Sequence, residues 1–142
     1  MRVVFYVPGR PMPKARPRVT KKGYAYTPRK TMAFEQSVVL AYRKSKAAGE
    51  QFPEGVPLLM ELTFTFAPPK SWSKARREDV IRRGMCPTCR PDLDNLMKGV
   101  ADALNGVAYK DDGQIAGAVI RKQYGRKDNT RVIIETMEQP EG

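Results

Sequence analysis

The sequence predicts one α/β domain of the α+β kind, in which a small mixed β-sheet is flanked by helices. Its 142 residues suit a single domain, and the 41% that are hydrophobic suffice for a packed core. Apolar residues alternate along 58–66, as on a strand, whereas along 93–104 they recur at the three- and four-residue spacing of an amphipathic helix. Two such periods in one chain indicate helices packed on a sheet.

The first half of the chain predicts a strand, a hairpin and a helix. Residues 2–7 are rich in β-branched and aromatic side chains, which is typical of a strand. A proline-rich loop follows, and residues 18–27 then alternate about a Lys-Gly pair that can form a small hairpin. Thr31 is the predicted N-cap of a helix over about 32–46.

The second half predicts a strand, two helices and two more strands. After strand 58–66, a short basic helix lies within 70–84, with Ser71 or Ser73 as its cap. A loop leads to the amphipathic helix, which Asn105-Gly106 ends. The last strands are predicted at 114–124 and 130–137, and the tail 138–142 of the single domain 1–142 is expected to fray.

The charge of the chain indicates a polyanionic partner. There are 26 Lys and Arg against 15 Asp and Glu, giving a net charge of +11. A protein this basic usually binds nucleic acid. The sequence has neither a long apolar run nor a signal-like start, so we expect a cytoplasmic protein without a membrane partner.

The chain contains no histidine, which narrows the chemistry it can perform. Nucleophilic catalysis by Ser-His-Asp or Cys-His arrangements is excluded, as is any nuclease that depends on histidine. The P-loop pattern is also missing. Any catalysis must therefore use Asp, Glu, Lys, Tyr or Cys.

The segment RPDLDNLMKGVADAL, residues 90–104, concentrates charged side chains of catalytic type. On a helix, Asp94 and Lys98 lie one turn apart, whereas Asp92 would point roughly 160° away from Asp94. The two aspartates can share a face if Asp92 is the N-cap, so the helix should begin at or just after Asp92. A purely structural alternative is a capping aspartate followed by an Asp94–Lys98 ion pair on a solvated face.

A second acidic pair, Asp111-Asp112, follows in a predicted turn. We expect this turn to fold back so that Asp112 completes a site with Asp92 and Asp94 at the helix start. Clustered carboxylates repel one another unless a cation joins them, and their hard oxygen atoms suit Mg²⁺. The pattern therefore predicts a metal-dependent phosphodiesterase.

The motif D-x-D-N-L-x-K at 92–98, followed by D-A-L and D-D-x-Q-I, resembles the RusA family of Holliday junction resolvases. The upstream segments PKARPRV and GYAYTPRKTMAFE resemble the same family, so the resemblance covers most of the chain. It implies a RusA-like fold and a homodimeric, Mg²⁺-dependent endonuclease, with Mn²⁺ as an alternative ion. Such an enzyme cuts four-way DNA junctions symmetrically in recombination and repair. The resemblance also suggests a bacterial or phage origin.

The resemblance assigns roles to individual residues. It implies four catalytic residues, which are Asp92, Asp94, Lys98 and Asp112. The metal ligands would be the three aspartates of this set, with Asp111 as a further candidate.

Other residues are candidates by their chemistry. We expect basic side chains to contact DNA phosphates, namely Lys14, Arg16, Arg18, Lys21, Lys22, Arg29, Arg76 and Arg90. Trp72 is expected to anchor the core. Cys86 and Cys89 form a C-x-x-C pair that supplies half of a tetrahedral Zn²⁺ site, and free thiols or a disulfide are the alternatives.

Two other functions remain compatible with the residues. One is a metal-dependent nuclease that prefers another kind of branched DNA. The other is a basic DNA- or RNA-binding protein without catalysis, in which the acids only cap and form ion pairs. The spaced acids and Lys98 favour an enzyme, because a simple binding protein does not need them.

Overall fold

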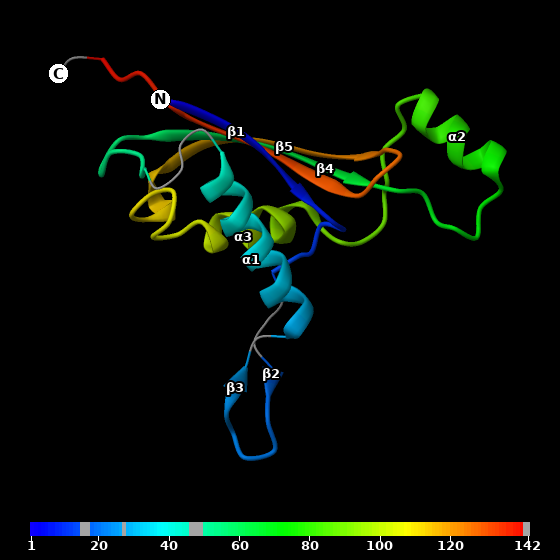
Figure 1. The fold of residues 1–142 in the computed structure, drawn as a ribbon, viewed down its shortest axis with the longest axis horizontal. Coiled ribbons are helices and arrows are strands. Elements are labelled where there is room, and N and C mark those ends of the chain that lie inside the picture. Colours follow the sequence, from blue (N-terminus) through cyan, green and yellow to red (C-terminus); the bar gives the residue numbers. More distant parts are fainter. Residues whose placement is uncertain (15–17, 27, 46–49, 141–142) are drawn as a thin grey trace.

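The computed structural model describes residues 1–14, 18–26, 28–45 and 50–140, and for Arg18 and Tyr26 it describes the backbone alone. Within these residues the chain forms a four-stranded mixed sheet, a two-stranded hairpin and three α-helices (Figure 1). The predicted α+β class, with a small mixed sheet flanked by helices, is confirmed.

The elements follow the chain in the predicted order. They are β1 (Arg2–Pro8), β2 (Arg18–Val19), β3 (Ala25–Tyr26), α1 (Arg29–Lys44), β4 (Leu58–Phe66), α2 (Lys74–Arg82), α3 (Leu93–Ala103), the 3-10 turn η1 (Asp112–Gln114), β5 (Ile115–Tyr124) and β6 (Asn129–Thr136).

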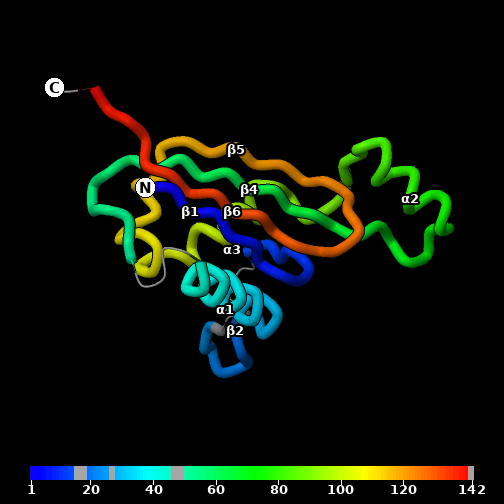
Figure 2. Tube along the Cα trace, turned by 45° about the horizontal axis from the view of Figure 1, so that its top comes forward, coloured from blue at the N-terminus to red at the C-terminus, as the bar shows by residue number. Residues whose placement is uncertain are grey.

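The main sheet has the strand order β1-β6-β4-β5, and Figure 2 shows these strands side by side. Strand β6 is antiparallel to both β1 and β4, whereas β4 and β5 are parallel. A parallel pair needs a long crossover, which α2, α3 and their loops provide. Because β4 and β5 are parallel, their carboxyl ends lie at the same edge of the sheet.

Helices α1 and α3 cover one face of the sheet and form the core with it. On β1 every second side chain is buried, and α3 contributes a stripe that includes Leu96, Val100 and Leu104. The hydroxyl of buried Tyr109 donates to the carbonyl of Ala101 at 2.6 Å, which satisfies its polar atom and ties the segment after α3 to the helix.

The opposite face of the sheet is open. Val4, Tyr6 and Val119 are 41%, 61% and 56% exposed there. Two elements extend from the body: the β2–β3 hairpin projects beyond the start of α1, and α2 lies beyond the ends of β4 and β5 (Figure 1). Among the described residues no helix is long and apolar enough to cross a membrane.

Local details of the first half confirm one prediction and correct another. Thr20 and Gly23 close the predicted hairpin turn, in which Gly23 has a φ of +87°. The N-cap prediction was wrong, because α1 begins at Arg29 after Pro28, and Thr31 lies in its first turn, 3% exposed. Thr31 faces the core, so its position reflects packing rather than capping. The predicted helix end near Lys46 lies outside the described residues.

The expectation that Trp72 anchors the core was also wrong. Its ring lies half-buried outside the core cluster, 5.8 Å from the Tyr124 ring, and the Arg76 guanidinium covers it at 3.6 Å. The α2 segment is instead capped by Ser73, whose hydroxyl accepts from the backbone N–H of Arg76. One of the two predicted caps is thereby confirmed.

Candidate active site

Asp92 stands at the start of α3 with an extended backbone, φ −72° and ψ 144°, and the helix begins at Leu93. This confirms the predicted helix start. The apolar stripe of α3 faces the core, so Asp94 and Lys98 are exposed on its other side. The cause is the three- and four-residue spacing of the apolar side chains, which fixes the rotation of the helix.

The carboxylates of Asp92 and Asp94 do not perform the purely structural roles considered above, namely helix capping and an ion pair with Lys98. The Asp92 side chain makes no capping hydrogen bond. Within the described residues no ion pair joins Asp94 to Lys98. Both side chains therefore remain available to a ligand at a helix N-terminus.

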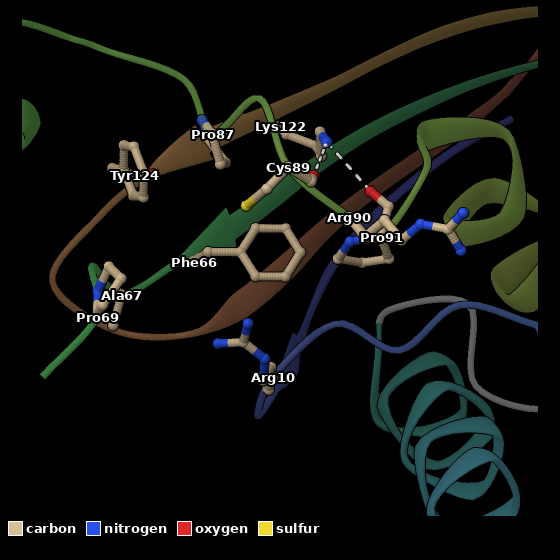
Figure 3. Close-up of a pocket in the computed structure, with 10 residues that line it drawn as sticks. All are labelled: Arg10, Phe66, Ala67, Pro69, Pro87, Cys89, Arg90, Pro91, Lys122 and Tyr124. Atoms are coloured by element: carbon tan, nitrogen blue, oxygen red, sulfur yellow. Dashed lines mark hydrogen bonds between the residues drawn. The ribbon is translucent and has the colours of Figure 1, made fainter. Parts of the chain in front are cut away.

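Residues 85–91 lead into Asp92, and Lys122 of β5 holds their backbone. Its ammonium donates to the carbonyl oxygens of Cys89 at 2.8 Å and Pro91 at 3.1 Å (Figure 3). The chain then enters α3, and Asp92 lines a hollow of about 340 Å³ with Arg10, Arg90 and other residues. Lys122 thus positions the segment that presents Asp92.

The proline-rich segment from Pro11 to Lys14 packs directly on α3. The N–H of Lys14 donates to the Asn95 carbonyl at 3.0 Å. A Cβ at Gly99 would lie 3.2 Å from the Met12 carbonyl oxygen, so glycine permits this close approach. The packing brings the basic N-terminal segment to the helix that carries the aspartates.

Lys14 itself forms an ion pair that the sequence did not suggest. Its ammonium lies 2.7 Å from Glu35 Oε1 and 3.7 Å from Asp102 Oδ2, with side chains about a quarter exposed. The hydrogen bond with Glu35 is the main reason that the pKa of Lys14 is raised. Lys14 therefore links its own loop to α1 and α3. For the predicted contact with DNA, its ammonium would have to bind a phosphate while it remains paired with Glu35 and Asp102.

Asp111 and Asp112 lie after α3, at its C-terminal end. The N–H of Asp112 donates to Asn105 Oδ1 at 3.0 Å, in the turn that ends the helix. Partial burial, followed by the charges of Asp102 and Asp111, raises the pKa of Asp112. These three acids form a second acidic group.

The prediction that Asp112 joins Asp92 and Asp94 at the helix start was wrong for the single chain. Asp92 and Asp102 are ten positions apart, which corresponds to about 15 Å along a helix. Among the described residues no three acidic or cysteine side chains form a group able to hold a metal ion. The turn that contains Asp111 and Asp112 was correctly predicted. It lies at the C-terminal end of α3, however, so Asp112 does not share a metal ion with Asp92 and Asp94 of the same chain.

The predicted DNA contacts occupy several surfaces. Lys21 and Lys22 are exposed at the hairpin turn, and Arg29 is exposed at the first turn of α1. Arg76 lies over Trp72, and Arg90 lies beside Asp92. Arg16 lies outside the described residues, as does the side chain of Arg18.

The two cysteines lie in the segment before Asp92. Both Cys86 and Cys89 are exposed free thiols, so the disulfide alternative does not hold in this structure. Neither belongs to a group of three or more metal-binding side chains among the residues that the structure describes. The Zn²⁺ site therefore remains a prediction that would need ligands from another chain.

The structure adds residues that the sequence did not single out. Arg10, Phe66, Lys122 and Tyr124 gather around the segment before Asp92 (Figure 3). They come from the ends of three strands far apart in the sequence. The sequence carried only a partial signal for them: each residue lies within three positions of the end of a predicted strand.

The fold and the uncommitted carboxylates thus describe a small, basic α+β protein that carries a pair of exposed acids at a helix start. Residues 8–136 match the family model "Endodeoxyribonuclease RusA". A Bacillus subtilis (strain 168) protein named "Uncharacterized protein YqaN" is 34% identical over 140 residues, which cover 93% of this chain and 94% of the relative. The Lactococcus phage r1t protein "Crossover junction endodeoxyribonuclease rusA" is 31% identical over 120 residues, covering 82% of this chain and 81% of the relative.

The chain therefore belongs to the RusA family of endodeoxyribonucleases. Its class as an enzyme, a nuclease that hydrolyses phosphodiester bonds, follows from this membership. The non-catalytic alternative is thereby excluded.

Proposed function

We propose that this protein is a homodimeric, Mg²⁺-dependent endonuclease that resolves four-way DNA junctions in recombination and repair. The observation that carries the proposal is the pair of uncommitted carboxylates, Asp92 and Asp94, exposed at a helix start beside basic side chains. The name of the phage relative supports the choice of junctions as substrate.

The residues present fit a Mg²⁺ ion. Such an ion is usually held by carboxylates and completes its shell with water and substrate phosphate oxygens, so the exposed side chains of Asp92 and Asp94 are suitable ligands. When bound, Mg²⁺ lowers the pKa of a water molecule and stabilises charge on the attacked phosphate. Mn²⁺ suits the same oxygen ligands.

The remaining groups of the site bind and orient the DNA. Lys98 lies one helical turn from Asp94 on the exposed side of α3, where its ammonium can offset charge that develops on the phosphate. Arg10 and Arg90 share a hollow with Asp92 and would hold the backbone beside the bond that is cut.

A homodimer supplies two sites, which the cutting of two strands requires. It also gives Asp112 a route into the metal site. Within one chain about 15 Å of helix separate the two acidic groups, whereas Mg²⁺ ligands lie about 2 Å from the ion. We therefore propose that the Asp112 of each metal site comes from the partner subunit.

The first experiment measures Mg²⁺-dependent nicking of a synthetic four-way junction by Asp94→Asn. We expect junction binding to be retained and the nicking rate to fall by at least about 100-fold, since the carboxylate acts on the metal and not on the fold. Glu138→Gln, a change of an exposed acid near the C-terminus, serves as the matched control. Equal cleavage by wild type and Asp94→Asn would reject the site, and a preference for linear duplex would reject the substrate.

Mixing two inactive variants tests the shared site. Asp92→Asn and Asp112→Asn chains would each be inactive alone. A mixed dimer would contain one intact site if Asp112 acts across the boundary, so nicking should return on mixing. The absence of rescue, with mixed dimers demonstrated by size and tag capture, would place the site within one chain or remove Asp112 from it.

A further inference from the structure

A pocket of about 190 Å³ lies directly before the candidate active site (Figure 3). Its walls are Phe66 at the end of β4, Tyr124 at the end of β5, and the Arg90-Pro91 segment that leads into Asp92. The carboxyl ends of parallel strands are where open α/β sheets commonly bind ligands. Arg10, Arg90 and Pro91 line both this pocket and the hollow that contains Asp92, so the pocket adjoins the candidate site.

The chemistry of the walls combines positive charge with flat apolar surface. Arg10, Arg90 and Lys122 line the pocket, and no acidic residue in the described part of the chain does. The ammonium of Lys122 is occupied by two backbone carbonyls, so Arg10 and Arg90 are the cations left for a ligand. The Arg10 guanidinium lies 5.2 Å from the centre of the Phe66 ring. A ligand that is both anionic and planar matches these walls, and a nucleotide is such a ligand.

A further ring and a further cation lie next to the pocket. Tyr124 contacts Trp72 at a ring-centre distance of 5.8 Å, and the Arg76 guanidinium lies over the Trp72 ring at 3.6 Å. A surface that alternates aromatic rings with guanidinium groups is typical of proteins that bind unpaired nucleic acid, because bases stack on the rings and phosphates pair with the cations.

We propose that this pocket binds one unpaired nucleotide of the DNA substrate, with the base against the half-buried Tyr124 ring and the phosphate at Arg10 and Arg90. The inference rests on the proposed function, because the nucleotide would belong to the strand that Asp92 and Asp94 cut. A base at a branch point has already lost part of its stacking, whereas a base inside a duplex must be extruded at a cost. The pocket would thus favour branched over continuous duplex DNA.

The binding test uses Tyr124→Leu, which removes the ring and keeps a smaller apolar side chain. Affinity for a short unpaired oligonucleotide, measured by anisotropy in EDTA, should fall about 10-fold, the loss expected for one stacked base. Tyr124→Phe keeps the ring and should bind as wild type does. Tyr6→Leu, at an exposed tyrosine on the open face of the sheet, is the matched control and should have no effect.

The location test uses the fluorescence of Trp72, the only tryptophan in the chain. A base that stacks beside Tyr124 should quench this fluorescence with the same concentration dependence as the anisotropy signal. In parallel, 2-aminopurine placed at successive positions around the branch of a junction should report one unstacked base with wild type and none with Tyr124→Leu.

The two failures are distinguishable. The proposed function fails if the wild type shows no Mg²⁺-dependent junction cleavage, which neither fluorescence measurement uses. The pocket proposal fails if Tyr124→Leu binds oligonucleotide as tightly as Tyr6→Leu, if Trp72 does not respond, or if no 2-aminopurine position is unstacked.

Discussion

Replacement of Lys122 by methionine tests whether the segment before Asp92 must be held in place. Methionine keeps most of the apolar stem of the side chain and removes only the ammonium. The two hydrogen bonds lost are those to Cys89 and Pro91, at 2.8 and 3.1 Å. No acid pairs with Lys122 in the described residues, so the effect isolates these two bonds.

The expected loss of stability is moderate. Hydrogen bonds to a charged group contribute about 1.5–3 kcal/mol each when buried, and Lys122 is only half-buried, so we expect about 2 kcal/mol in total. For a domain of this size that corresponds to a decrease of roughly 6 °C in the midpoint of thermal unfolding. The fold should therefore survive at the assay temperature.

The expected loss of activity is larger than the loss of stability suggests. A displacement of about 1 Å at a catalytic group can cost about 100-fold in rate, and freeing the segment before Asp92 permits such a displacement. The assay is single-turnover nicking of a four-way junction at saturating enzyme, with thermal unfolding measured on the same samples. Lys127→Met, at an exposed lysine in the β5–β6 turn, is the control. A folded Lys122→Met variant that cuts within twofold of wild type would refute the positioning role.

Three further predictions concern charge. In EDTA, Asp112→Asn should raise the thermal midpoint at pH 7, because burial and acidic neighbours raise the pKa of Asp112 in the folded protein. The gain should vanish below the ordinary pKa of 3.8, where Asp112 is protonated in both the folded and the unfolded state. An unchanged midpoint at pH 7 would contradict this prediction. Lys14→Met should lower the free energy of unfolding by about 1 kcal/mol in urea titrations, and this loss should shrink in a Glu35→Gln background if the 2.7 Å ion pair is its cause. The double variant Lys21→Ala/Lys22→Ala should reduce the slope of log affinity against log salt for junction binding by about two, and an unchanged slope would show that the hairpin does not contact DNA.

The apolar periods of the sequence predicted most elements correctly. Alternation over 58–66 corresponds to β4, and the spacing of Leu96, Val100 and Leu104 corresponds to the buried face of α3. These patterns are local consequences of burying one side of a regular element, so they can be recognised without knowledge of the partner. The helix start at Asp92 was predictable for the same reason, since Pro91 and the stripe limit where α3 begins.

The errors arose where a residue's role depends on what packs against it. Thr31 has the chemistry of an N-cap, but its side chain is buried and α1 begins two residues earlier, at Arg29. Trp72 has the size of a core anchor, yet it lies half-buried outside the core, in contact with the Tyr124 ring and covered by Arg76. Residue type suggests such roles, and only the neighbouring elements decide between them.

By itself, the sequence determined the α+β class, the basic surface and the identity of the uncommitted acids, because these depend on composition and on periods along single elements. Only the tertiary structure decided which side chains meet. The parallel pairing of β4 and β5 brings Phe66, Tyr124 and Lys122 to the segment before Asp92. The length of α3 keeps Asp112 at the far end, beside Asp102. Both outcomes follow from strand direction and helix rise, which set distances between residues that the chain order leaves undetermined.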